Sequence, residues 1–177
     1  MTTVISTYTP FPGQMAGWLL SEPELWWLYH TAQRMNSIVE VGSFCGRGTH
    51  ALLNGCNGLV FAIDHFKGSL KAEDATYNLD AKKCFLRNVG GYEHLKLLEM
   101  SSLEASCKFA DRAVDMIFID ASHLYEDVLA DILAWYPKTS RLLCGHDYSL
   151  EGVQRALEES ALPYKQVENT DIWEVQL

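Results

Sequence analysis

Short apolar segments alternate with helix-like segments along most of the chain. Five of the apolar segments have the composition of short strands, most of them apolar on both faces: residues 38–42, 59–64, 95–100, 116–120 and 141–145. Helical patterns separate them, at about residues 48–54, 81–89, 102–104 and 124–136. Strands of this kind, joined through helices, form a parallel sheet that helices cover on both sides. The sequence therefore predicts an α/β fold with three layers.

The N-terminal region precedes this alternation. A stretch rich in Pro, Gly and Thr at residues 2–17 predicts an irregular arm. Ser21 can cap a helix that runs from about residue 23 to about residue 35, with Glu22 and Glu24 in its first turn. This helix joins the arm to the first strand.

The last part of the chain predicts one more helix and two more strands. They are expected at residues 150–160, 164–167 and 172–175. The 177 residues have the length of one domain. We therefore expect a single domain over residues 1–177, with the arm and first helix at 1–36 and the core at 37–177.

The composition limits the classes of partner and the cellular location. A net charge of −9, with no run of Lys or Arg, argues against nucleic-acid binding and against an anionic membrane surface. The five cysteines are scattered and form no C-x-x-C pair, which favours free thiols in a reducing cytoplasm. The chain begins without a signal-peptide pattern and contains no apolar stretch of transmembrane length. We expect a cytoplasmic protein without nucleic-acid or membrane partners.

A glycine-rich turn follows the first strand. The pattern G-x-x-x-G-x-G is formed by Gly42, Gly46 and Gly48, and Glu40 lies two residues before it. A carboxylate there repels a pyrophosphate but attracts an ammonium or sulfonium group, and S-adenosylmethionine carries both cations. Asp64 ends the second strand, where a carboxylate can accept both ribose hydroxyls. The alternatives are a structural turn, and a solvated strand end or a helix cap for Asp64.

These motifs resemble the class I S-adenosylmethionine-dependent methyltransferases. Within that family, the sequence is most similar to a subgroup with macrolide-sugar O-methyltransferases and cephalosporin-hydroxylase-like proteins. The resemblance rests on residues 17–20, 38–49, 61–64, 102–105 and 115–148, the last with Ile-Asp-x-x-His-x-Tyr and Gly-His-Asp-Tyr. It implies a Rossmann-like methyltransferase fold with a seven-stranded, mostly parallel sheet in the order 3-2-1-4-5-7-6.

The resemblance also implies a set of cofactor-binding residues. S-adenosylmethionine is expected to contact the first strand end and its turn, the second and fourth strand ends, and the short helix near residue 102. The expected cofactor-binding residues are Glu40, Gly42, Ser43, Gly46, Gly48, Thr49, Asp64, His65, Ser102 and Asp120. For Ser102, an ordinary position at a helix start is the alternative.

A second group of polar residues follows the fourth and fifth strands. Asp120 ends one strand and His146 and Asp147 follow the other, so neighbouring strands would bring the carboxylates close together. Carboxylates at that distance repel unless a proton or divalent cation lies between them. The resemblance implies that acids at these positions hold Mg²⁺, but His146 replaces the first acid of the pair, and a histidine ligand would admit Mn²⁺ or a similar ion. The predicted metal ligands are Asp120, His146 and Asp147.

The resemblance assigns a general base to His123, which follows Asp120 at the start of a helix. A neutral imidazole can take a proton from a substrate hydroxyl. The predicted catalytic residues are His123 and Asp120. Three structural roles are the alternatives: His123 as a helix cap, His146 bound to a backbone carbonyl, and Asp147 in an ion pair with Arg141 or Arg155.

Together these features predict methyl transfer from S-adenosylmethionine to a hydroxyl of a small molecule, assisted by a divalent metal. The acceptor pocket would be completed by the arm, by the loop at residues 65–80, or by a second copy in a homo-oligomer. Two rivals use the same scaffold: a non-methylating enzyme, and a non-catalytic nucleoside-binding protein.

Overall fold

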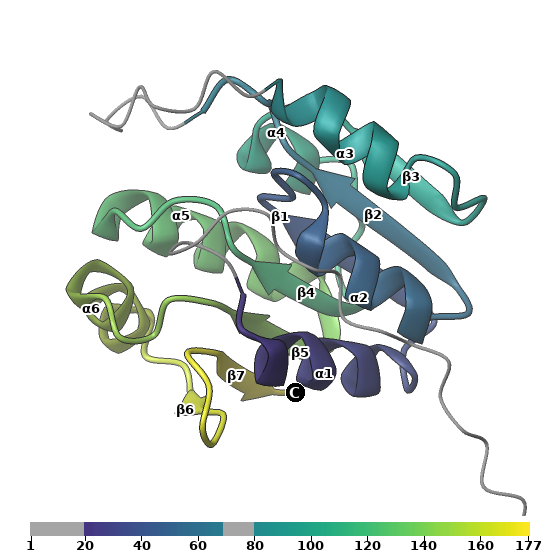
Figure 1. Cartoon of the computed structure of the whole chain (residues 1–177). Helices are drawn as coiled ribbons and strands as arrows, with labels where there is room; N and C mark the ends of the chain where they lie inside the picture. The colour runs from purple at the N-terminus through teal and green to yellow at the C-terminus, as the bar shows by residue number, and fades with distance from the viewer. Residues whose placement is uncertain (1–19, 69–79) are drawn as a thin grey trace, which may run out of the picture.

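Seven strands form one sheet in the order β3-β2-β1-β4-β5-β7-β6 (Figure 1). The computed structural model describes residues 20–68 and 80–177, so the arm and most of the loop at residues 65–80 lie outside the described residues. In chain order, the strands are β1 (Ser37–Val41), β2 (Leu59–Ile63), β3 (Leu95–Leu98), β4 (Val114–Ile119), β5 (Thr139–Gly145), β6 (Lys165–Gln166) and β7 (Trp173–Gln176). The order is the one that the family resemblance implies, and the predicted fold class is confirmed.

The helices also occur where the sequence pattern predicts them. They are α1 (Glu22–Ala32), α2 (Arg47–Gly55), α3 (Ala81–Val89), α4 (Ser102–Ser106), α5 (Tyr125–Trp135) and α6 (Glu151–Ser160), with a 3₁₀ turn η1 (Tyr136–Lys138) after α5. Ser21 caps α1 as expected, in a capping box with Glu24, but the helix ends at Ala32 rather than near residue 35. Among the described residues, the helices are too short and too polar to cross a membrane.

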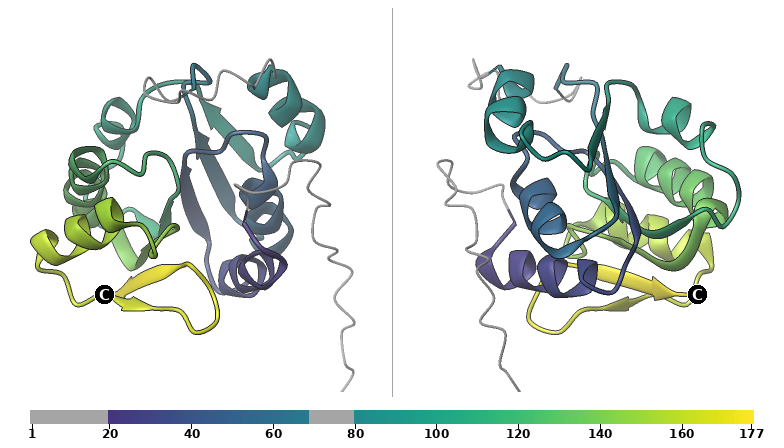
Figure 2. Two further views of the ribbon diagram at one scale, coloured as in Figure 1. Left: turned by 60° about the vertical axis from the view of Figure 1, so that its left-hand side comes forward. Right: turned by 90° about the vertical axis from the view of Figure 1, so that its right-hand side faces the viewer.

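Two apolar cores lie on opposite faces of the sheet. Figure 2 shows α1, α2 and α3 on one face and α4, α5 and α6 on the other. Neighbouring residues of one strand point to opposite faces, so Ile38 belongs to the first core and Val39 to the second. All four of Ile38, Val39, Met116 and Ile117 are fully buried. The central strands are apolar on both faces because both faces are covered.

The carboxyl ends of β1, β4 and β5 lie at one level of the sheet. These strands are parallel, and the register places Val41 beside Ile119 and Ile119 beside Gly145. The next residues continue the pairing: the amide of Asp120 donates to the carbonyl of Val41 at 2.7 Å, and the amide of His146 donates to that of Ile119 at 3.0 Å. Residues that follow these strands therefore lie side by side at one edge.

Replacement of Trp135 by Ala should strongly destabilise the fold. Trp135 is fully buried, and its indole N–H donates to the Ser102 hydroxyl at 2.8 Å. Removing a buried Trp costs about 3–5 kcal/mol in the free energy of unfolding. Urea denaturation measures this loss, with Leu133→Ala as the control because Leu133 lies on the same helix and is 58% exposed. Equal stability of the two variants would contradict the assignment of α5 to the core.

Candidate functional site

The glycine-rich turn after β1 encloses a buried carboxyl group. Glu40 is 2% exposed and accepts a hydrogen bond from the Thr49 hydroxyl on α2. A side chain at Gly48 would displace the buried Glu40 carboxyl, so glycine keeps this carboxyl close to α2. Gly42 has a φ of +88°, and a side chain on it would collide with the backbone carbonyl of Asp120. Two of the three glycines are thus required by close approach to site residues.

Burial changes the ionisation of Glu40. The desolvation of this carboxyl outweighs its hydrogen bond from Thr49 and raises its pKa to about 8. The negative charges of Asp120 and Asp64 act in the same direction. A carboxyl in this state is neutral near neutral pH and would ionise when a cation binds beside it. The turn therefore offers a latent negative charge to a positively charged ligand.

Asp64 fixes the other side of the turn. Its carboxylate accepts the amide of Phe44 at 2.8 Å and the amide of Phe66 at 2.7 Å, and its side chain is partly exposed. An open depression of about 410 Å³ lies beside it, at the ends of β2 and β3. Its lining residues are His65, Lys67, Glu99, Met100, Ser101 and Glu104. The depression and the partly exposed Asp64 face the same end of the sheet as the glycine-rich turn.

Two of the expected cofactor-binding residues have structural contacts in this region. The Ser102 hydroxyl donates to Asp131 at 2.5 Å and accepts from Trp135, which ties α4 to α5. His65 is exposed, and its Nδ1 accepts the amide of Lys67 at 3.0 Å. The capping box of α4 is formed by Ser101 and Glu104. Binding of S-adenosylmethionine by Ser102 or His65 stays a prediction.

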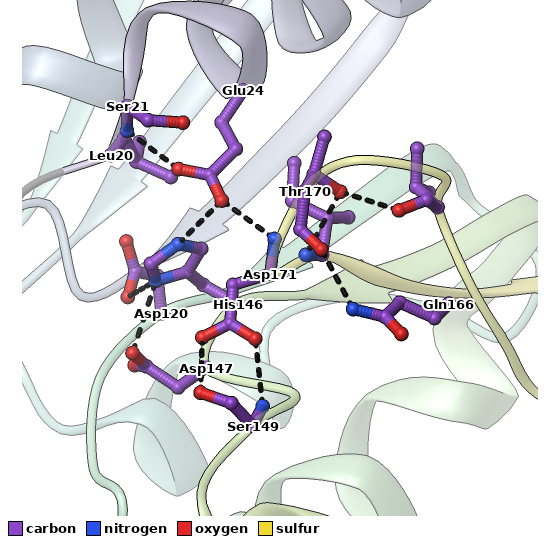
Figure 3. A network of polar contacts seen from close by, with 12 residues as sticks. Leu20, Ser21, Glu24, Asp120, His146, Asp147, Ser149, Gln166, Thr170 and Asp171 are labelled. Atoms are coloured by element: carbon purple, nitrogen blue, oxygen red, sulfur yellow. Dashed lines mark hydrogen bonds and ion pairs between the residues drawn. The ribbon is translucent and has the colours of Figure 1, made fainter.

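Asp120, His146 and Asp147 meet at the edge formed by β4 and β5 (Figure 3). One potential ligand atom from each lies within 4.8 Å of the others. His146 Nδ1 lies 3.2 Å from an Asp147 oxygen and 3.8 Å from an Asp120 oxygen. The structure thus brings together the three residues that the sequence predicted as metal ligands.

His123 joins this group through Asp147. Its Nδ1 lies 2.8 Å from Asp147 Oδ2, while the other carboxylate oxygen of Asp147 faces His146. Asp147 reaches both rings with a φ of +59°, a left-handed conformation that is uncommon outside glycine and recurs at functional sites. Because Asp147 holds Nδ1 of His123, the opposite ring nitrogen is the one that can take a proton. His123 is 42% exposed at its side chain, so a ligand can reach it.

Glu24 on α1 is a member of the site that sequence reasoning missed. Its carboxylate is 4% exposed and lies 3.3 Å from His146 Nε2 (Figure 3). The same carboxylate accepts the amide of Asp171 at 2.7 Å and the amide of Ser21 at 2.5 Å. In the sequence, Glu24 has the position of a helix-capping acid, which it also is, and no local pattern links it to His146.

The charges of this group shift one another. Burial favours neutral His146, but the carboxylates of Asp147 and Glu24 outweigh burial and raise its pKa to about 11. Burial raises the pKa of Asp120 to about 6. The hydrogen bonds from the two histidines overcome burial and hold the pKa of Asp147 below its usual range. The hydrogen bond to Asp147 raises the pKa of His123.

Solved structures of O-methyltransferases have the same fold as this chain. The O-methyltransferase from Bacillus cereus, solved in complex with SAH, superposes with a TM-score of 0.65 at 18% identity over 91% of this chain and 84% of that one. The O-methyltransferase TomG from Streptomyces achromogenes, involved in tomaymycin synthesis and solved in complex with SAM, gives 0.66 at 14% identity over 92% and 82%. At these identities, the likeness establishes the architecture.

Comparison of sequences identifies the family. Over 137 residues, the chain is 29% identical to the protein y4gI of Sinorhizobium fredii, covering 71% of this chain. The chain spans 14% of the length of that relative. A family model described as a methyltransferase domain matches residues 39–148, from β1 to the residue after Asp147. The match covers more than half of the chain and includes the glycine-rich turn and the Asp120–His146–Asp147 group, so the chain belongs to this family of methyltransferase domains.

Proposed function

We propose that the protein transfers a methyl group from S-adenosylmethionine to a hydroxyl of a small molecule. The observation that supports this most is the placement of two complementary groups at one sheet edge. A glycine-rich turn with the buried carboxyl of Glu40 lies next to the hydrogen-bonded pair of His123 and Asp147. The turn with Glu40 suits a cationic methyl donor, and the pair of His123 and Asp147 suits removal of a proton from an acceptor.

The residues around the turn fit S-adenosylmethionine. Glu40 would face its positive charge, Asp64 would accept the ribose hydroxyls, and Gly42 and Gly46, both at positive φ, leave the backbone open to close approach. When bound, S-adenosylmethionine supplies an electrophilic methyl group on a positively charged sulfur. The depression at the ends of β2 and β3 combines the apolar side chain of Met100 with polar groups such as Ser101, a mixture that could receive an adenosine group.

The group of Asp120, His146 and Asp147 fits a divalent cation. Two carboxylates and the Nδ1 of an imidazole converge, and the other ring nitrogen of His146 lies 3.3 Å from the Glu24 carboxylate. A mixed oxygen and nitrogen set suits Mg²⁺ less well than Mn²⁺ or a similar ion. A bound cation would acidify the acceptor hydroxyl. Asp120 has a second role, because its backbone packs against Gly42 and links the two halves of the site.

His123 is the proposed general base. Asp147 orients the ring and stabilises its protonated form, so the opposite ring nitrogen would take the proton of the acceptor hydroxyl, while the oxygen would displace the thioether of the donor from the methyl carbon as the carbon–sulfur bond breaks. The exposed side of His123 leaves room for the acceptor. The wall of the acceptor pocket beyond it would come from residues outside the described part or from a second copy of the chain.

We also propose that residues 1–177 form one domain. The five free thiols support a location of the protein in a reducing cytoplasm.

Asp64→Asn should weaken S-adenosylmethionine binding about 10- to 100-fold, because a hydrogen bond to a charged group contributes about 1.5–3 kcal/mol. The variant keeps the size of the side chain but can accept only one of the two amides, because Phe44 donates to Oδ2 and Phe66 to Oδ1, so thermal unfolding checks that the turn stays folded. Isothermal titration calorimetry measures the dissociation constant. Asp111→Asn is the control, because Asp111 is 72% exposed and precedes β4 at the opposite edge. Equal affinities of the two variants would exclude Asp64 from the cofactor site.

His123→Ala should lower turnover about 100- to 10,000-fold, the usual contribution of a general base. Affinity for S-adenosylmethionine should stay the same, since His123 is expected to act on the acceptor. The assay follows transfer of a labelled methyl group to a panel of small phenols, catechols and sugars. His94→Ala is the control, because His94 precedes β3 at the far edge and contacts the Leu53 carbonyl.

The same assay distinguishes the rival functions. Labelled product that disappears in His123→Ala supports the proposal. Tight binding of S-adenosylmethionine with no transfer to any member of the panel favours a nucleoside-binding protein. Consumption of an acceptor without transfer of label favours a non-methylating enzyme. Wild-type turnover by His123→Ala would remove the base from the mechanism.

A further inference from the structure

Glu24 links three segments that are distant in the sequence. It caps α1 through the Ser21 amide, holds the turn before β7 through the Asp171 amide, and contacts His146 Nε2. The Asp171 carboxylate in turn accepts the amide and the hydroxyl of Ser149, at 2.7 and 2.8 Å, in the loop that follows Asp147 (Figure 3). The carboxylate of Glu24 is therefore fixed on several sides and cannot move away from the ring without breaking these bonds.

This arrangement separates the two nitrogens of His146 by function. Nε2 faces Glu24, and Nδ1 faces Asp147 and Asp120. A carboxylate at one ring nitrogen keeps a proton there, so the other nitrogen is the one that gives up its proton when a metal binds, as outer carboxylates arrange at many metal sites. We infer that Glu24 is a positioning residue that fixes His146 with its proton on Nε2 and so prepares Nδ1 as a ligand for a divalent cation.

The inference concerns a residue outside the three metal ligands, and it rests on the metal part of the proposed function. Two observations favour it over a purely structural role for Glu24. The capping box and the Asp171 contact use both oxygens of the carboxylate, so neither contact needs an imidazole at this position. His146, with a side chain only 12% exposed, is nevertheless oriented with one nitrogen at Glu24 and the other at the two aspartates.

Mn²⁺ affinity of the protein without S-adenosylmethionine or acceptor tests the inference. Electron paramagnetic resonance measures the free Mn²⁺ in titrations of wild type, Glu24→Gln and Glu22→Gln. Glu24→Gln keeps the size of the side chain and an oxygen for the Asp171 amide but loses the charge. Its Mn²⁺ affinity should fall about 10- to 100-fold, as is typical when an outer carboxylate is lost. Glu22→Gln should bind as wild type, because Glu22 lies exposed in the same helical turn.

Thermal unfolding shows whether Glu24→Gln is folded. A second measurement, the ¹⁵N NMR spectrum of the histidines, needs no variant of Glu24. In the wild type labelled with ¹⁵N-histidine and saturated with Zn²⁺, a diamagnetic ion that takes imidazole nitrogen, His146 should be neutral with its proton on Nε2; its signals are assigned by their loss in His146→Gln. A proton on Nδ1, wild-type Mn²⁺ affinity in folded Glu24→Gln, or no Mn²⁺ binding by the wild type would each overturn the inference. The Mn²⁺ titration contains no methyl donor, so a failure of methyl transfer would not affect its result. If the protein transfers methyl groups in the presence of a chelator and does not bind Mn²⁺, only this inference is overturned and the proposed methyl transfer stands.

Discussion

The amides that follow β4 and β5 continue the hydrogen bonding of the sheet beyond the last strand residues. Asp120 donates to Val41 and His146 donates to Ile119, so the residues after the strands are held as rigidly as the strands themselves. Gly42 lies against the backbone of Asp120 with no space for a side chain. The glycine-rich turn and the group of Asp120, His146 and Asp147 are therefore in direct backbone contact. A shift in either strand would move both halves of the site.

The second constraint is charge. Four carboxyl groups, those of Glu24, Glu40, Asp120 and Asp147, lie at this edge with little exposure to water. The fold tolerates them because their charge is reduced or balanced. The Glu40 carboxyl is largely protonated, and the carboxylates of the other three lie around the ring of His146. Such an arrangement costs stability unless cations compensate it. A cluster of carboxyl groups at the end of a parallel sheet is therefore consistent with ligands that are themselves cationic.

The sequence predicts the sheet well because its signals are local. Alternating apolar segments and helices mark β1 to β5, and acids at the strand ends mark the functional edge before any contact is known. The shared edge then places Asp120 beside His146, because parallel neighbours end together. The last two strands are shorter or shifted: β6 has two residues, and β7 begins at Trp173 rather than residue 172. β7 pairs antiparallel with β5, and β6 pairs antiparallel with β7, and the segments do not encode these pairings by themselves.

Contacts between distant segments explain what the sequence could not show. Glu24 is recognisable only as a capping acid, since its contact with His146 depends on how α1 packs beside the sheet. Ser102 suits a cofactor contact by position, yet its hydroxyl binds Asp131 and Trp135 on α5. His123 and Asp147 pair through the left-handed backbone of Asp147, a conformation that Asp tolerates but that its residue type alone does not predict.

Calorimetric titration of chelator-treated protein with S-adenosylmethionine tests the central claim most directly. Two buffers of different ionisation enthalpy at neutral pH should give saturable binding with release of protons, because a cation beside Glu40 favours its ionised form. Glu40→Gln should bind more weakly and release fewer protons. No binding by the folded wild type, with or without added Mn²⁺, would contradict the account and leave the glycine-rich turn as a structural connection.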